Sequence, residues 1–118
     1  MSVEPMIPRS LRSPRRTVAE RLRAALLHLA EGTADIPIHS ETPWASITFA
    51  GTRHRLTLQF AGPDAVAAGE RLIDALPDHE FTLPRHLVAD AQVIAVDHRL
   101  SPDPHMTVRV EILLVEEC

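Results

Sequence analysis

The 118-residue chain contains no Lys and no Tyr, and all twelve of its basic residues are Arg. Without Lys there is no residue for Schiff-base chemistry, for attachment of pyridoxal phosphate or for the lysine of a phosphate-binding P-loop. The only aromatic residues are three Phe and one Trp, so the core must consist mainly of Leu, Val, Ile and Ala. Arg in place of Lys, together with abundant Ala, is typical of a composition bias of the source genome.

Cysteine and long apolar runs are also scarce. The single cysteine, Cys118, has no intrachain partner, so no disulfide framework exists and we expect a cytoplasmic location. No apolar run of 18 residues is present, and we expect no membrane partner. Residues 1–30 carry six Arg against two acids, whereas the remainder carries six Arg against fourteen acids. This acidic body argues against nucleic acid as a partner, because phosphate contacts supply most non-specific affinity.

The first fifteen residues differ from the rest of the chain. Residues 1–15 are rich in Arg and Pro and have little apolar periodicity, which predicts a flexible arm. A solvated terminus explains this arm, although its Arg residues could also touch nucleic acid or an acidic partner. Residues 16–118 are predicted to form a single α+β domain. The length is that of one domain and allows a hydrophobic core that needs no disulfide bond or metal ion for stability.

Two stretches have the period of an amphipathic helix. The first begins at Thr17, whose spacing to Glu20 fits a capping box, and Gly32 is a good C-terminal stop. The second begins at Pro63, which suits a first helical turn because it lacks an N–H and its φ is already helical. The turn at Pro77 ends this second helix.

Four stretches have the two-residue period of a half-buried strand. They cover residues 44–50, 53–60, 87–96 and 106–114. A hairpin turn is predicted at Gly51-Thr52, and residues 32–43 are predicted to be a loop because of their turn-forming residues. The last strand is the longest and most apolar, so we place it in the centre of the sheet.

The resulting order αββαββ resembles a ferredoxin-like domain, βαββαβ, in circularly permuted order, with the first strand moved to the end. We expect an α+β two-layer sandwich with a four-stranded antiparallel sheet and two helices on one face. The predicted sheet order is third, fourth, second and first strand, because the crossover leaves room for one strand. Polar residues are expected on the free face: Ser46, Thr48, Arg55, Thr57, Gln59, Thr107, Arg109 and Glu111.

The seven His residues are the main candidates for a chemical role in this chain. Four polar residues around the predicted last hairpin could hold a metal ion through two imidazoles and a carboxylate. These are Asp97, His98, Asp103 and His105. Their presence in a solvated hairpin explains them equally well. A second group at the opposite end of the sheet comprises His54, His79 and His86. We predict no catalytic residue and no cofactor, because no Ser lies on a nucleophile elbow and no phosphate-binding Gly loop exists.

An apolar patch is expected on the free face of the sheet, formed by Trp44, Ile94, Leu113 and Val115. Such a patch usually marks an interface, and a homodimer is the leading prediction for the partner, with a small-molecule ligand as another. The sequence therefore predicts a bacterial, non-catalytic binding or assembly module. The alternative is a His/Asp-based metal-binding protein or enzyme with a site near residues 97–105.

Overall fold

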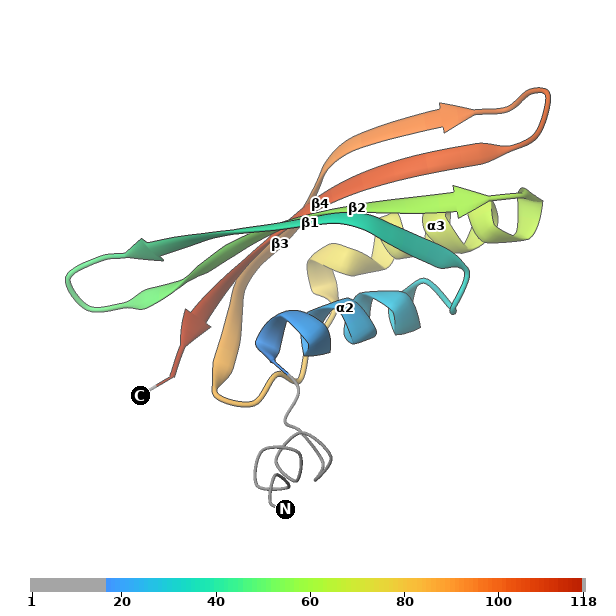
Figure 1. The fold of residues 1–118 in the computed structure, drawn as a ribbon. Helices are drawn as coiled ribbons and strands as arrows, with labels where there is room; N and C mark the ends of the chain where they lie inside the picture. The colour runs from blue at the N-terminus through green and yellow to red at the C-terminus, as the bar shows by residue number, and fades with distance from the viewer. Residues whose placement is uncertain (1–16, 118) are drawn as a thin grey trace, which may run out of the picture.

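The computed structural model describes residues 17–117, so the predicted arm at residues 1–15 lies outside the described part. The elements follow the predicted order αββαββ, with a short 3-10 turn after the second helix (Figure 1). The helices are α2 (Val18–Leu29) and α3 (Pro63–Ala75), followed by η1 (Leu76–Asp78). The strands are β1 (Ala34–Ala45), β2 (Ala50–Ala61), β3 (His86–Arg99) and β4 (His105–Glu116).

The four strands form one antiparallel sheet in the order β1-β2-β4-β3, which confirms the predicted sheet order. Both helices lie on the same face of this sheet (Figure 1). The inner strand β4 turns every second side chain toward the helices, and these residues are buried. They are Met106, Val108, Val110, Ile112 and Leu114.

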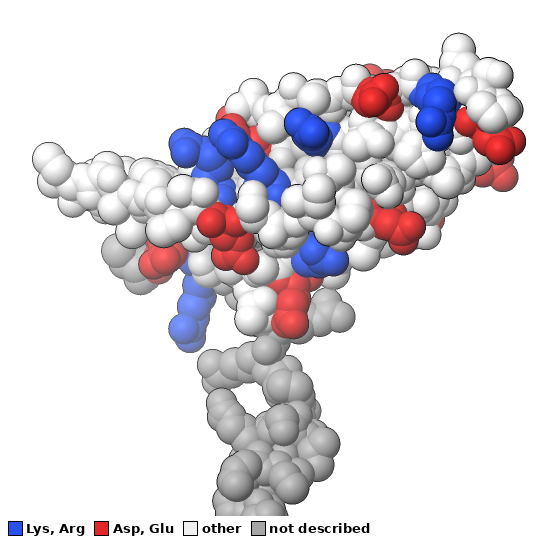
Figure 2. All heavy atoms as spheres, turned by 45° about the horizontal axis from the view of Figure 1, so that its top comes forward, with Lys and Arg blue, Asp and Glu red and all other residues white. Residues whose placement is uncertain are grey.

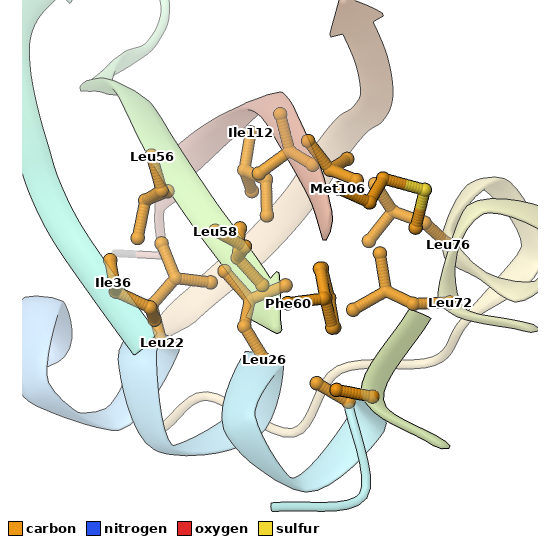
Figure 3. Close-up of a cluster of buried hydrophobic side chains, with 14 of the residues drawn as sticks. Leu22, Leu26, Ile36, Leu56, Leu58, Phe60, Leu72, Leu76, Met106 and Ile112 are labelled. Carbon is orange, nitrogen blue, oxygen red and sulfur yellow. The ribbon is translucent and has the colours of Figure 1, made fainter. Parts of the chain in front are cut away.

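The core lies between the helices and the two inner strands (Figure 3). Leu22 and Leu26 of α2 pack there with Leu72 of α3 and Leu76 of η1, and all four are fully buried. From β2 they meet Leu56, Leu58 and Phe60. Each such side chain stabilises the fold by about 1.5–3 kcal/mol through burial, so this layer supplies the main favourable term.

The helix ends follow the predicted local chemistry. The Thr17 hydroxyl accepts from the Glu20 N–H at 3.1 Å, and the Glu20 carboxylate accepts from the Thr17 N–H at 2.9 Å, which confirms the capping box. At the other end of α2, Glu31 has a φ of 60° and Gly32 a φ of 72°. The Gly32 N–H donates to the Leu27 carbonyl, so the helix ends in a Schellman motif.

The prediction for the first strand is wrong. Residues 32–43 are not a loop, because β1 covers Ala34–Ala45, and the hairpin turn lies at residues 46–49 rather than at Gly51-Thr52. Pro37 and Pro43 fit in β1 because it is an edge strand with one hydrogen-bonded neighbour. Residues 46–49 therefore leave the sheet, and neither Ser46 nor Thr48 lies on the free face as predicted.

Strand β3 departs from simple alternation at two bulges, between Val88 and Asp90 and between Val93 and Ala95. Each bulge adds one residue and moves the following side chains to the other face. Ala91 and Val93 pack against the core, whereas Ala95 pairs with Arg109 on the free face. The two-residue period predicted over residues 87–96 is therefore wrong at these two bulges.

The strands are much longer than the helices that cover them. Twelve helical residues in α2 span about 18 Å, whereas twelve residues in β2 span about 40 Å. The two hairpins therefore extend beyond the helix layer in opposite directions (Figure 1). Several large apolar residues are exposed on them: Ile47, Phe49, Ile94, Val96 and Leu100.

Candidate functional site

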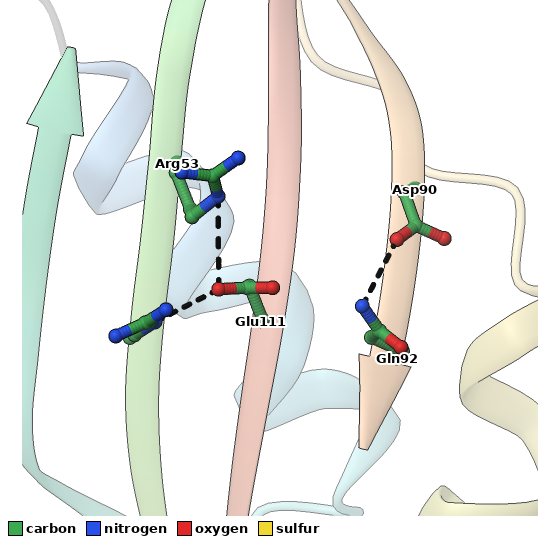
Figure 4. A network of polar contacts seen from close by, with 5 residues as sticks. Arg53, Asp90, Gln92 and Glu111 are labelled. Atoms are coloured by element: carbon green, nitrogen blue, oxygen red, sulfur yellow. Dashed lines mark hydrogen bonds and ion pairs between the residues drawn. The ribbon is translucent and has the colours of Figure 1, made fainter. Parts of the chain in front are cut away.

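Within residues 17–117, one face of the sheet carries no helix, and Figure 4 shows this open face with the helices behind the strands. Near the β1–β2 turn, one residue from each strand lies in a single row across the sheet. Trp44 pairs with Gly51, Gly51 with Val115, and Val115 with Leu87. Leu113 lies on the same face in the next row. We call Trp44, Leu87, Leu113 and Val115 the apolar patch.

Three members of this patch were predicted and the fourth was not. The Leu87 side chain is 55% exposed, and the other three are half-buried. Ile94, which was also predicted, lies at a bulge of β3 further along the sheet. Leu87 lies within the predicted strand 87–96, but it was missed because its place beside Val115 depends on the β3–β4 register.

Gly51 allows the Trp44 indole to lie across β2. A Cβ at Gly51 would lie 2.9 Å from Trp44 Nε1 and would overlap the carbonyl oxygen of Leu114. The indole Nε1 is buried and has no hydrogen-bond partner among residues 17–117. Packing against the sheet, rather than a hydrogen bond, therefore holds this side chain at the edge of the apolar patch.

Charged residues lie beside the patch on the open face. Arg55 Nε donates to Glu111 Oε2 at 2.8 Å, and Arg53 Nε lies 3.6 Å from the same oxygen (Figure 4). Gln92 Nε2 donates to Asp90 Oδ2 at 3.2 Å on β3. Figure 2 shows charged groups of both signs separated by uncharged surface, so the face in view has no extended basic field. Exposed ion pairs contribute about 1 kcal/mol at most, so these residues add little to stability.

A second unusual group lies on the helix side of β1 and β2. Of the described residues, His54 is the one polar or charged residue that is fully buried. It pairs in register with Glu41, and His39 is two residues before Glu41 on the same face of β1. His39 Nε2 lies 2.8 Å from His54 Nδ1, with the two rings tilted by 48°. One possible ligand atom from each of the three side chains lies within 4.8 Å of the others.

Burial sets the charge state of the two imidazoles. Desolvation lowers the pKa of both His39 and His54, because it disfavours the charged ring. The negative charge of Glu41 acts in the opposite direction on both rings. The His54 Nε2 atom is buried and has no hydrogen-bond partner among the described residues. Near neutral pH both rings are therefore neutral. They share a hydrogen bond between His39 Nε2 and His54 Nδ1, in which one nitrogen donates its proton and the other accepts it.

The four ligands predicted near the last hairpin all lie at the far end of β3 and β4, but on different faces. Asp97 and His105 occupy open-face positions, whereas His98 pairs with the buried Met106 and lies on the helix side. Asp103 lies in the connecting turn. Within residues 17–117, the one group of three with ligand atoms this close is His39, Glu41 and His54. A metal at residues 97–105 stays a prediction.

Two members of the other predicted histidine group line one groove. His79 and His86 line a groove of about 500 Å³ between η1 and β3, and His54 does not line it. His79 packs edge-on against Phe81 with ring centroids 4.6 Å apart. The charge of His86 still acts on His54 and lowers its pKa. His39 and Glu41 were missed because their segment was predicted to be a loop; the β-branched residues around Pro37 were the available signal for a strand.

No protein-family model matches the chain, and no curated protein matches it either. Two solved structures are similar in fold. One is a chain of the virion of a native gene transfer agent particle, at 18% identity and a TM-score of 0.48, covering 84% of this chain and 89% of that chain. The other is the type 4 fimbrial biogenesis protein PilO from Pseudomonas aeruginosa, at 13% identity and a TM-score of 0.40, covering 91% and 73%. Identities and TM-scores this low carry no argument about function.

Neither helix in the described part of the chain has the length and apolar character needed to cross a bilayer.

Proposed function

We propose that this chain is a non-catalytic assembly module that works as a homodimer, in which two copies pack through their open sheet faces. The observation that carries the proposal is the apolar patch, which lies on the face that neither α2 nor α3 covers. Leu87 alone is 55% exposed there. Burying apolar surface contributes about 25 cal/mol per Å², so a second copy on this face gains free energy. A cytoplasmic location is part of the same proposal, because the one cysteine gives no intrachain disulfide.

The area of the open face supports a stable pair. Four strands about 4.8 Å apart and about 40 Å long give a face of roughly 750 Å². Standard protein–protein interfaces bury about 800 Å² on each partner. One face of this sheet therefore suffices for a specific dimer without help from the hairpin tips.

The edges of the sheet are poor alternatives for association. The edge strand β1 contains Pro37 and Pro43 and has a bulge between Asp35 and Ile38. The other edge strand, β3, has two bulges. Proline and bulges are the usual devices that prevent strand addition at an edge. Pairing through the open face is therefore favoured over pairing through an edge.

Two rows of the open face are complementary to the same rows of a second copy. A two-fold axis parallel to the strands, passing between β2 and β4, would place β2 of one copy over β4 of the other. Arg55 and Glu111 are opposite each other in the same row, so each Arg55 would lie over Glu111 of the partner subunit. In the apolar row, Trp44 would lie over Leu87 of the partner subunit. The same rotation therefore pairs opposite charges in the Arg55 row and apolar side chains in the Trp44 row. In the row between them it places Arg53 over Leu113 of the partner subunit.

Light scattering coupled to size-exclusion chromatography tests the dimer. We expect twice the chain mass of 13.1 kDa at micromolar concentration. Leu87→Lys should raise the dissociation constant at least tenfold, because two charges enter the interface. Leu100→Lys is the matched control, since Leu100 is 72% exposed at the other end of the sheet. A monomeric wild-type chain at high micromolar concentration, or equal weakening by both variants, would refute the proposal.

A further inference from the structure

We propose that His39, Glu41 and His54 bind a divalent transition-metal ion. This site goes beyond the proposed dimer, because it lies on the helix side of the sheet, away from the apolar patch. The hairpin register brings its ligands together: Glu41 is directly opposite His54, and His39 lies on the same face two residues earlier. Two neighbouring strands of one hairpin therefore supply all three groups.

The donor set is one that proteins use for transition metals. Two imidazole nitrogens and one carboxylate oxygen form three-ligand zinc sites with an open position, and also form facial triads. His54 is fully buried and His39 is half-buried, so packing holds both rings in place. Glu41 is exposed and brings a negative charge. The solvent side next to Glu41 is open for water molecules to complete the coordination.

The contact between the two ring nitrogens must change when an ion binds. At 2.8 Å, His39 Nε2 and His54 Nδ1 form a hydrogen bond, so one of these nitrogens carries a proton. A bound ion would take the place of that proton, because a metal-ligating imidazole offers a nitrogen lone pair. Imidazole donors suit Zn²⁺, Cu²⁺ and Ni²⁺, and a mixed nitrogen and oxygen donor set binds Ni²⁺ and Cu²⁺ strongly. Ni²⁺ is therefore a suitable ion with which to probe the site.

The surroundings of the site are mixed in charge. Arg23 of α2 donates to the Ile36 carbonyl at 3.4 Å, and its positive charge acts on His39. The negative charge of Glu41 acts in the opposite direction on His39, and it also acts on His54. Because the three ligands provide a single negative charge, a bound divalent ion would leave the site positive. A site of this kind is expected to take an anion or water at its open positions.

Calorimetric titration of the full chain with NiCl₂ tests the site. The wild type should bind one equivalent, and His39→Ala should lose on the order of 100-fold in affinity, since removal of even outer-shell groups costs 10–100-fold. Glu41→Gln, at an exposed position, should weaken binding about tenfold. A chain with both His98→Ala and His105→Ala is the matched control and should bind as the wild type does. Leu87→Lys should also bind normally, which separates this proposal from the dimer.

Nuclear magnetic resonance locates the ion without relying on any variant. Paramagnetic Ni²⁺ at substoichiometric amounts should broaden the ring signals of His39 and His54 first. Broadening that starts at His98 and His105 would overturn the proposal and move the site to the predicted 97–105 hairpin. Absence of one-to-one binding at millimolar Ni²⁺, or unchanged affinity in His39→Ala, would also overturn it.

Discussion

Replacing Gly69 by Ala should destabilise this protein, although the same change stabilises most helices. Gly69 lies in the interior of α3, where Ala is normally favoured by about 1 kcal/mol. Here an added Cβ would lie 3.0 Å from the Cγ and the Cδ1 of Phe60 and would overlap the Cε of Met106. Phe60 is fully buried, so its ring has no free space into which it can move.

The size of the effect follows from two opposing contributions. Overpacking a core typically lowers the free energy of unfolding by about 1–3 kcal/mol. The higher helix propensity of Ala raises it by about 1 kcal/mol. We therefore expect a net loss of about 1 kcal/mol for Gly69→Ala. In a domain of this size that corresponds to a fall in Tm of about 4–8 °C. Met106→Leu removes the Cε atom, so Gly69→Ala should cost less in that background.

Urea unfolding followed by circular dichroism measures these differences for the wild type, both single variants and the double variant. Ala67→Gly in the same helix is the control, and it should lose about 1 kcal/mol through propensity alone. A gain of about 1 kcal/mol for Gly69→Ala, mirroring this control, would refute the reasoning. So would an unchanged effect of Gly69→Ala in the Met106→Leu background.

Two further predictions concern the first helix and the histidine pair. Thr17→Ala removes one half of the capping box and should cost about 1 kcal/mol in thermal unfolding, whereas Thr17→Ser should retain most of the stability; equal losses would contradict this. With EDTA present, the free energy of unfolding should fall as the pH drops below the ordinary histidine pKa of about 6.5. Because burial lowers the pKa of His54 and His39 in the folded state, the unfolded state then binds more protons. A urea midpoint that stays constant between about pH 7.5 and about pH 5 would contradict this.

The elements that bury a regular face were predictable from the sequence. Burial of one face imposes a period of two on a strand and of 3.6 on a helix, so β4 and α3 show their structure in residue order alone. The capping box at Thr17 is also local, because its hydrogen bonds span three residues. The helix start at Pro63 is local because it depends on the fixed φ of that proline. These local patterns were enough to give the order of the sheet through the crossover rule.

The first strand could not be placed in the same way. Strand β1 contains two Pro and five polar residues, and Ile36 is its one buried side chain. A segment of this composition normally forms a loop. It becomes a strand here because the exposed edge of β2 offers a row of hydrogen-bonding groups, and an edge strand can do without a partner on its outer side.

The sequence by itself determined the apolar period of the helices and of β4, the helix starts and the central position of β4. Each of these depends on the spacing of neighbouring residues. Only the tertiary structure decided which distant residues meet. His39 and Glu41 reach His54 through the β1–β2 register, and Leu87 reaches Val115 through the β3–β4 register. A register shift of one residue would turn each of these side chains to the other face, and nothing in the local sequence fixes the register.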